Sequence, residues 1–291
     1  MGLRISRQAV KKLKALNFSH KVPVKVYRQR IEDTFTVKTL PNKVDYKDIV
    51  VNGVQCGLLK PELIAEKRVI LYIHGGCYAA GSRHSWRNFC ASISNEGASK
   101  LVIPEYRLAP EHPFPCAIDD IEQVYNHLAE KNCRVILAGD SSGCAIALAL
   151  IRRLMDNFQN LPAAAAFLSP WIRPDRSAFH SVEKKSGDPI ITSEGLMAAA
   201  ELYTFSKNMG NPLVSPLEGS LAGFPPLFVQ CGGSELLLSD AKALSDKAGQ
   251  ADIPCELDVW EDMCHLFQMA DEYVSEAHLA IHKLGAFMRN F

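Results

Sequence analysis

Short apolar runs, separated by longer amphipathic stretches, recur along most of the 291-residue chain. Runs with the length and composition of β-strands lie at residues 49–51, 54–59, 69–73, 101–104, 134–138, 164–168, 227–231 and 256–260. Helix-like stretches, such as 116–130 and 241–250, lie between them. Strands that alternate with helices predict an α/β fold with a mostly parallel sheet covered on both faces.

Two segments depart from this alternation. The first runs from residue 1 to about 45 and is basic, and its apolar residues predict a surface helix. These residues recur at helical spacing: Ile5, Ala9, Val10, Leu13 and Leu16. The second segment, from about 173 to about 209, interrupts the rhythm of strands and helices. It begins as a polar loop, and a helix is expected through Leu196, Ala200 and Tyr203.

The sequence GDSSG at residues 139–143 stands between a strand-like run and a helix. Residues 135–138 are apolar and of strand type, and residues 144–151 are typical of a buried helix. A G-x-S-x-G pattern at such a turn is the context of a nucleophile elbow, in which a tight turn presents the serine hydroxyl. We therefore expect Ser141 to be a nucleophile.

A nucleophilic serine needs a base and an acid that orients the base. His265 is the candidate base, because it follows the strand-like run 256–260 and precedes the last predicted helix. Glu235 is the candidate acid, because it follows the apolar run 227–231 and two glycines. Asp240 is the second candidate for the acid, although it suits the first turn of a helix better.

A candidate oxyanion loop follows the apolar run 69–73. It contains Gly75, Gly76 and Cys77, and the glycines let the backbone turn its N–H groups toward the elbow. The residue after the nucleophile, Ser142, would add a further N–H. His74 precedes this loop, and we expect it to hold the loop by hydrogen bonding rather than to act as the base.

These motifs resemble those of the hormone-sensitive-lipase-like esterases, a branch of the α/β-hydrolases with an HGGG oxyanion motif and a GDSAGG elbow. Here the two motifs read HGGC at 74–77 and GDSSGC at 139–144. Further blocks of the resemblance span most of the chain: YRLAPEHPFP at 106–115, DPIIT at 188–192, SPL at 215–217, GSELL at 233–237 and WEDMCH at 260–265. The order serine, acid, histidine is also that of this superfamily.

The resemblance implies one α/β-hydrolase domain over residues 1–291. A small helical cap would be formed by about 1–45 and about 173–209. The resemblance implies a catalytic triad of Ser141, Glu235 and His265. It also implies an oxyanion hole built from backbone amides: Gly75, Gly76, Cys77 and Ser142.

Two positions of these motifs carry cysteine in place of glycine. Cys77 stands at the third glycine of the oxyanion motif, and its Cβ excludes backbone geometries that only glycine reaches. We expect its side chain near the pocket floor, beside the carbonyl of the substrate. Cys144 replaces the last elbow glycine, which suggests a slightly looser contact between helix and strand. We expect its side chain to be a small buried hydrophobe.

Composition narrows the range of partners. The chain has 32 Lys and Arg against 32 Asp and Glu, which gives no electrostatic case for nucleic acid. No apolar run approaches membrane-spanning length, and the N-terminus lacks the apolar region of a signal peptide. Residues 1–6 match a myristoylation pattern that short sequences often match by chance, so we expect no stable membrane anchoring. Nine cysteines without metal-type spacing favour the cytoplasm and argue against a metal site.

The predicted function is that of a serine carboxylesterase that acts on short-to-medium acyl esters through an acyl-enzyme. Its partner would be a small-molecule ester, and it would need neither a cofactor nor a metal. An amide or formamide hydrolase on the same fold is the alternative. A non-enzymatic small-molecule receptor is less favoured, because receptors on this fold have lost the histidine that is present here as His265. The sequence leaves the natural substrate, the stereoselectivity and the oligomeric state open, a homodimer included.

Overall fold

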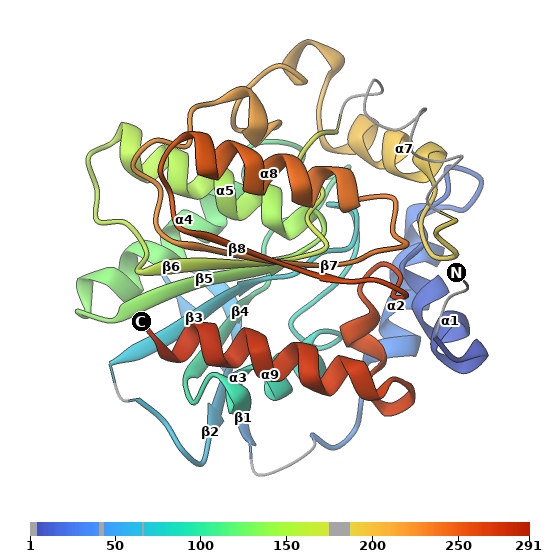
Figure 1. Ribbon diagram of the computed structural model, residues 1–291, viewed down its shortest axis with the longest axis horizontal. Coiled ribbons are helices and arrows are strands. Elements are labelled where there is room, and N and C mark those ends of the chain that lie inside the picture. Colours follow the sequence, from blue (N-terminus) through green and yellow to red (C-terminus); the bar gives the residue numbers. More distant parts are fainter. Residues whose placement is uncertain (1–4, 41–43, 66, 175–186) are drawn as a thin grey trace.

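The computed structural model describes residues 5–40, 44–65, 67–174 and 187–291. Eight strands form one sheet in the order β1-β2-β4-β3-β5-β6-β7-β8 (Figure 1). Their bounds are β1 Val44–Val51, β2 Val54–Pro61, β3 Arg68–Ile73, β4 Lys100–Pro104, β5 Arg134–Asp140, β6 Ala164–Leu168, β7 Leu227–Gly232 and β8 Cys255–Trp260. The strand-like runs of the sequence are all confirmed as strands, and the largest difference is that β1 begins at Val44 rather than at residue 49.

Six strands, from β4 through β3, β5, β6 and β7 to β8, run parallel to their neighbours. β1 and β2 add an antiparallel ribbon at the edge next to β4. The central strands are almost entirely buried, because helices cover both of their faces. The carboxyl ends of the six parallel strands therefore meet at one edge of the sheet, and the loops that carry the expected catalytic residues follow them.

The helices form two layers around the sheet. The bounds are α1 Arg7–Leu13, α2 Val24–Phe35, α3 Arg87–Glu96, α4 Cys116–Glu130, α5 Ser142–Asp156, α7 Ser193–Tyr203, α8 Leu238–Gln250 and α9 Ser275–Arg289. Short 3-10 helices occupy Lys14–Leu16, Ser206–Asn208, Pro216–Glu218 and Phe267–Tyr273. Figure 1 shows α4, α5 and α8 on one face of the sheet and α3 and α9 on the other. The expected doubly covered α/β sheet is thus present.

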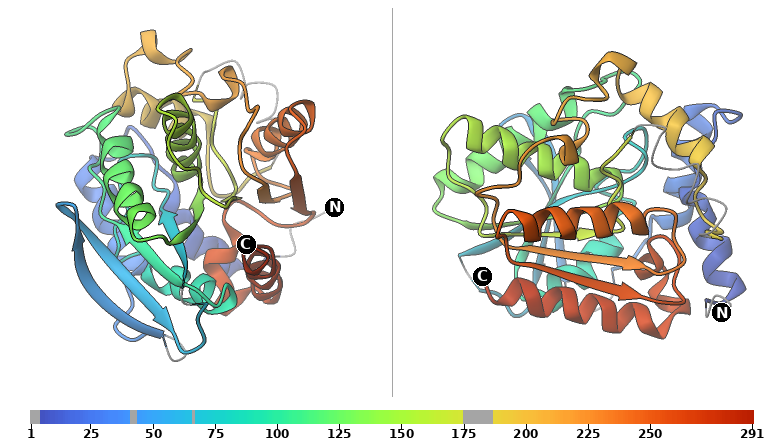
Figure 2. Two further views of the ribbon diagram at one scale, coloured as in Figure 1. Left: turned by 90° about the vertical axis from the view of Figure 1, so that its left-hand side faces the viewer. Right: turned by 45° about the horizontal axis from the view of Figure 1, so that its top comes forward.

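The two additional segments lie together at the carboxyl end of the parallel strands. Figures 1 and 2 show α1, α2 and α7 gathered at the end toward which β7 and β8 point. The first segment and α7 touch, because a Cβ on Gly195 would overlap the carbonyl oxygen of Phe18. His20 and Glu194 form an exposed ion pair between them at 3.2 Å. Residues 1–4 and 175–186 of these segments lie outside the described residues, and the cap stays a prediction.

One helix of the first segment was not expected from the sequence. α2 follows the predicted first helix and buries Tyr27, Ile31 and Phe35, one on each successive turn. This spacing of four residues is the helical signal that the sequence did contain.

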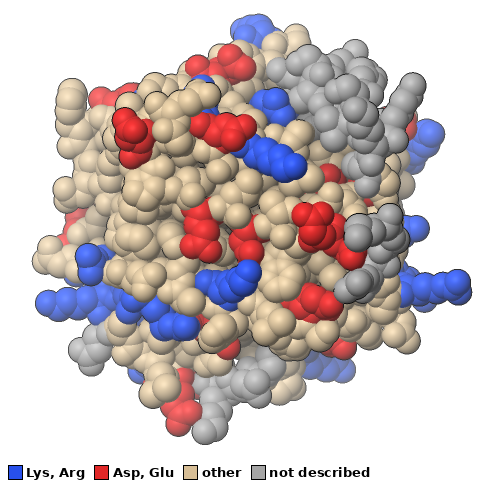
Figure 3. All heavy atoms as spheres, in the orientation of Figure 1, with Lys and Arg blue, Asp and Glu red and all other residues tan. Residues whose placement is uncertain are grey.

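The surface is mixed in charge. Acidic and basic side chains are interspersed over the face seen in Figure 3, in agreement with 32 residues of each sign in the sequence. Within the described part of the chain, the helices are too short or too polar for any one of them to cross a bilayer.

Candidate active site

Ser141 lies in a strained turn between β5 and α5. Its φ and ψ angles are 49° and −119°, and a positive φ is costly for a residue with a Cβ. The N–H of Ser141 donates to the carbonyl oxygen of Leu168 at 2.9 Å, which anchors the turn to β6. Glycine is required at Gly143, because a Cβ there would overlap the carbonyl oxygen of Ile73. The turn has the conformation expected of an elbow, and Ser141 is 4% exposed.

Glu235 and His265 meet between two adjacent loops. Glu235 follows β7, His265 follows β8, and both side chains are buried. His265 Nδ1 lies 3.1 Å from Glu235 Oε2. A carboxylate only accepts hydrogen bonds, so Nδ1 carries the proton and Nε2 is left as the acceptor. This is the tautomer that a general base requires.

Two glycines allow these loops to approach so closely. A Cβ on Gly232 would overlap the carbonyl oxygen of Met263, and a Cβ on Gly233 would overlap that of Glu261. The loops are also joined by backbone, since the N–H of Gly233 donates to the carbonyl of Trp260 at 2.8 Å. The glycines that precede the acid in the sequence therefore help to set the distance between acid and base.

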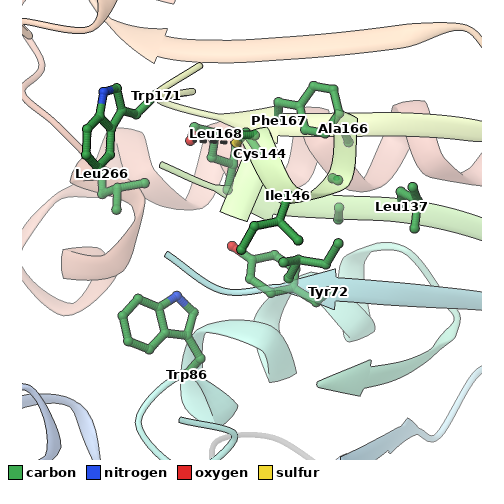
Figure 4. Packing of buried hydrophobic residues seen from close by; sticks show 14 of the residues in the cluster. Tyr72, Trp86, Leu137, Cys144, Ile146, Ala166, Phe167, Leu168, Trp171 and Leu266 are labelled. Atoms are coloured by element: carbon green, nitrogen blue, oxygen red, sulfur yellow. Dashed lines mark hydrogen bonds between the residues drawn. The ribbon is translucent and has the colours of Figure 1, made fainter. Parts of the chain in front are cut away.

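The loop of the base is fastened to the strand beside the elbow. The residue after His265, Leu266, donates its N–H to Ser169 Oγ at 3.3 Å. Ser169 directly follows Leu168, whose carbonyl accepts the N–H of Ser141. Figure 4 shows Leu266 at the same end of the sheet as Leu168. The structure thus brings the three expected triad residues to one end of the sheet.

A second carboxylate, that of the half-buried Asp188, lies near the acid and the base. Asp188 Oδ2 accepts the N–H of Leu236 at 3.0 Å, and Oδ1 accepts that of Ile190 at 2.8 Å. Burial raises the pKa of Glu235, and the hydrogen bond from His265 opposes the rise. Burial likewise raises the pKa of Asp188, and the nearby His265 opposes it. The sequence had indicated this residue only as part of the DPIIT block.

Asp240, the second candidate for the acid, has a different set of partners. Its Oδ1 pairs with Arg173 Nη2 at 2.7 Å. Its Oδ2 accepts the N–H groups of Ile172 at 3.0 Å and Arg173 at 3.1 Å. Asp240 lies in the first turn of α8, as the sequence suggested. Its carboxylate therefore holds the segment after β6, and Glu235 is the acid that contacts His265.

The oxyanion loop is a tight turn in which three successive residues have positive φ. The angles are 106° at Gly76, 57° at Cys77 and 59° at Tyr78. The left-handed conformation costs about 1–2 kcal/mol for each residue other than glycine. The carbonyl of Gly76 accepts the N–H groups of Ala79 at 3.1 Å and Ala80 at 2.9 Å, which closes the turn. The loop therefore adopts a turn that favours glycine, although two of its residues, Cys77 and Tyr78, have a Cβ that disfavours this conformation.

The first amide of the loop faces a buried carboxylate. Burial raises the pKa of Asp140 to about 6, and hydrogen bonds from Tyr72, Gly75 and Trp86 oppose the rise. Asp140 Oδ1 accepts from Tyr72 Oη and from Trp86 Nε1, each at 2.9 Å. The side chains of Tyr72 and Trp86 lie beneath the end of the sheet in Figure 4. Gly75, expected among the oxyanion donors, lies directly against Asp140, because a Cβ on Gly75 would overlap Asp140 Oδ2.

His74 holds the loop, as expected. Its Nδ1 donates to the carbonyl of Gly75 at 2.7 Å. Its ring stacks on Tyr106 with centroids 4.4 Å apart, and Tyr106 Oη donates to the carbonyl oxygen of His74 at 2.7 Å. Burial lowers the pKa of His74, so the ring is held neutral. These contacts account for His74 as a structural residue.

The two cysteines at glycine positions are both buried. Cys77 packs under the N-terminal segment, with its thiol at the hydroxyl of Tyr27 and the backbone N–H of Phe18, and burial raises its pKa to about 11. The side chain of Cys77, which was expected near the pocket floor, thus packs against Tyr27 of α2 and is buried. Cys144 Sγ donates to the carbonyl of Gly139 at 3.2 Å, as befits a small buried residue.

Both additional segments contact the oxyanion loop. Tyr203 of α7 stacks on Tyr78, with ring centroids 3.9 Å apart and an interplanar angle of 7°. Trp171 lies against the same ring at 5.1 Å. Arg28 of α2 donates from Nε to the carbonyl of Ala79 at 2.7 Å. The sequence analysis missed these contacts, because aromatic residues and a lone arginine carry no local sign of their long-range partners.

Known proteins share this sequence pattern and this architecture. Residues 70–269 match a family described by its α/β-hydrolase fold. An acetyl-hydrolase of Streptomyces hygroscopicus is 36% identical over 225 residues, which cover 76% of this chain and 75% of that protein. An esterase of Acinetobacter venetianus is 32% identical over 248 residues, which cover 84% and 82%.

The solved structures extend the likeness to almost the whole chain. An esterase from the bacterial hormone-sensitive lipase family has a TM-score of 0.90 at 32% identity, with 97% of this chain and 96% of that chain covered. A hormone-sensitive lipase from a metagenome library has a TM-score of 0.88 at 28% identity, with 100% and 99% covered. The chain therefore belongs to the α/β-hydrolase family, in its hormone-sensitive-lipase-like branch.

Proposed function

We propose that this chain is a serine carboxylesterase that cleaves short-to-medium acyl esters through an acyl-enzyme. Membership of the hormone-sensitive-lipase-like branch makes it a carboxylic ester hydrolase. The observation that carries the serine mechanism is the strained Ser141 at the same end of the sheet as the buried Glu235–His265 pair. The presence of this pair also favours an enzyme over a receptor.

The first half of the reaction would transfer the acyl group to the enzyme. Ser141 Oγ attacks the ester carbonyl carbon while His265 Nε2 takes the hydroxyl proton. Glu235 accepts the Nδ1–H bond and stabilises the imidazolium. The tetrahedral intermediate then collapses, the ester C–O bond breaks, and His265 gives its proton to the departing alcohol.

The second half would release the acid. A water molecule loses a proton to His265 and attacks the acyl carbonyl, and the bond to Ser141 Oγ breaks as His265 returns the proton. In both halves the carbonyl oxygen becomes an oxyanion that backbone amides stabilise. We assign this role to Gly76, Cys77 and Ser142, since the amide of Gly75 faces Asp140.

Two observations support a small acyl group. Ser141 is 4% exposed, and aromatic rings of Tyr78, Trp171 and Tyr203 pack together beside the elbow and its loop. A related protein is named an acetyl-hydrolase. We infer that the acyl group of the substrate is short to medium in length.

A panel of p-nitrophenyl esters from acetate to palmitate tests this proposal, with the matching p-nitroanilides as the amide comparison. We expect kcat/KM to be highest among the shorter esters and to fall toward palmitate. Ser141→Ala serves as the control for background hydrolysis. Higher activity on the anilides than on the esters would instead support the amide hydrolase.

A further inference from the structure

The amides assigned to the oxyanion hole come from two separate elements. Ser142 N–H belongs to the start of α5, whereas the amides of Gly76 and Cys77 belong to the loop after β3. A donor stabilises the developing charge only if it lies within hydrogen-bond distance of the oxyanion. The two elements must therefore stay in register to within a fraction of an ångström.

The loop adopts a conformation that its own sequence resists. Cys77 and Tyr78 have φ angles of 57° and 59°, and only glycine adopts such angles freely. Cys77 occupies the position of the third glycine of the HGGG motif. Without contacts that hold it, this part of the loop would relax toward negative φ and would carry its amides away from the elbow.

One side-chain hydrogen bond joins the strained loop directly to the elbow. The N–H of Tyr78 donates to Ser142 Oγ at 3.2 Å, and the bond is buried. The GDSAGG elbow of the family has alanine at this position, which offers no acceptor. This chain thus differs from the motif in both elements: cysteine replaces glycine in the loop, and serine replaces alanine in the elbow.

Besides its ring contact with Trp171, whose backbone N–H donates to the carbonyl of Ser141 at 3.1 Å, Tyr78 has two contacts that reach away from the elbow. Its carbonyl accepts the N–H of Ala109 at 3.0 Å, and its ring stacks on Tyr203 of α7. These contacts fix the outer side of the loop. The Ser142 hydroxyl fixes the inner side, next to the amides that would face the substrate.

We propose that Ser142, in addition to its own amide, acts through its hydroxyl as a positioning residue that holds the strained oxyanion loop against the elbow. The proposal rests on the proposed ester hydrolysis for its effect on rate. The hydroxyl itself is buried and bonded to a backbone amide, so it takes no part as a nucleophile. Its role is to keep the amides of Gly76 and Cys77 at a fixed distance from that of Ser142.

Ser142→Ala tests the proposal, because it removes the hydroxyl and keeps the amide. Loss of a whole oxyanion donor lowers kcat by about 10²–10³. We expect misplaced donors to lower kcat on p-nitrophenyl acetate by about 10- to 100-fold, with KM within about twofold. A trifluoromethyl ketone, whose adduct with Ser141 places an oxyanion in the hole, should bind more weakly by a similar factor.

Ser94→Ala is the matched control. Ser94 is a fully buried serine on α3 whose hydroxyl donates to the carbonyl of Ser99 at 2.7 Å. Its loss should affect thermal stability while kcat and affinity for the ketone stay at the parent values. If Ser142→Ala behaves like Ser94→Ala in both measurements, Ser142 Oγ has no positioning role.

A double-mutant cycle with Cys77→Gly tests whether the strain in the oxyanion loop is the reason why the Ser142 hydroxyl affects the rate. Glycine adopts the left-handed turn freely. The hydrogen bond from the Tyr78 N–H to Ser142 Oγ, which we call the tether, should therefore matter less when residue 77 is glycine. We expect Ser142→Ala to cost less than about threefold in kcat in the Cys77→Gly background, against about 10-fold or more in the parent. Equal losses in the two backgrounds would overturn the proposal. The cycle also covers a poorly folding Ser142→Ala, because the Cys77→Gly background should tolerate it.

Urea unfolding of the same four proteins (the parent, the two single variants and the double variant) distinguishes this proposal from the proposed function. With Ser142 present, Cys77→Gly relieves the strain and should raise the unfolding midpoint. In Ser142→Ala, where the loop has already relaxed, it should raise the midpoint less. If the parent protein hydrolyses no ester, the proposed function is contradicted. The difference between the two midpoint shifts would still show whether the tether holds the loop. Additive shifts in the midpoint would contradict the tether in either case.

Discussion

The ring of Tyr203 lies flat on the ring of Tyr78, with centroids 3.9 Å apart and an angle of 7° between the planes. Tyr203 is the last residue of α7, and Tyr78 belongs to the oxyanion loop. A contact between the additional helix α7 and the loop of candidate oxyanion donors is therefore built into the fold.

Truncation of this stack should change substrate binding. An aromatic pair contributes about 0.5–1.5 kcal/mol beyond its buried area. We expect Tyr203→Ala to raise KM for the shorter p-nitrophenyl esters by about 3- to 10-fold, and to shift the preference toward longer acyl chains as space opens beside the elbow. Tyr203→Phe keeps the ring and is the control. Identical KM values and chain-length profiles in Tyr203→Ala and the parent would remove α7 from the substrate site.

Glu235 and Asp240 should respond differently to loss of charge. Glu235→Gln no longer favours the tautomer of His265 that leaves Nε2 free, so kcat should fall by about 10³–10⁴ with little loss of fold. Asp240→Asn weakens a buried pair with Arg173, so it should lower the free energy of unfolding by about 2–3 kcal/mol and leave kcat near the parent value. Kinetics and urea unfolding of both variants give the comparison. A larger loss of kcat in Asp240→Asn would reassign the acid.

The carboxyl of Asp140 should make stability depend on pH. Burial raises its pKa from 3.8 to about 6, so between these values the folded protein keeps a proton that the unfolded chain releases. Stability from this group therefore falls as the pH rises from about 4 to about 6, and then levels off. The shift corresponds to about 3 kcal/mol.

Asp140→Asn isolates this contribution. The amide cannot titrate, so the unfolding free energy of the variant relative to the parent should rise by up to about 3 kcal/mol between about pH 4 and pH 7. Asp156→Asn, at an exposed position on the last turn of α5, is the control and should follow the parent. A difference between Asp140→Asn and the parent that stays constant across this range would show that Asp140 is not held in a shifted state.

Cys77 should be unreactive in the folded protein. Its thiol is buried beneath Tyr27 and its pKa is raised to about 11, so little thiolate is present or accessible at neutral pH. Cys133, which is only half buried, is the internal comparison. Iodoacetamide followed by peptide mass spectrometry should modify Cys133 at least about 100-fold faster than Cys77. Fast labelling of Cys77, with parallel loss of activity, would show that the N-terminal segment opens.

Local patterns were sufficient to predict the sheet and to place the three candidate catalytic residues at one end of it. Each strand-like run became a strand, because continuous apolar runs are buried in a sheet that helices cover on both faces. Ser141, Glu235 and His265 could be predicted because each follows a strand, and parallel strands deliver their carboxyl ends to one edge. Glu235 was preferred to Asp240 because Asp240 suited the first turn of a helix, and the motifs of the resembled family gave the same choice.

The remaining features depend on contacts between distant parts of the chain. The direction of the Cys77 side chain follows from a positive φ that the sequence does not reveal. The position of Asp188 beside Glu235 could not be predicted, because it depends on a contact with a distant part of the chain. Asp188 Oδ2 accepts the N–H of Leu236, the residue after Glu235. The helix α2 was missed because the basic composition of its segment masked three apolar positions spaced four residues apart.

Covalent labelling of the nucleophile tests the central claim most directly. A fluorophosphonate should add one group to the protein, abolish ester hydrolysis in step with the added mass, and be found on the peptide that contains Ser141. Ser141→Ala should take up no label and should lose kcat by about 10⁴-fold or more. A label on another residue with equal loss of activity, or a Ser141→Ala variant that retains the parent kcat, would contradict the account.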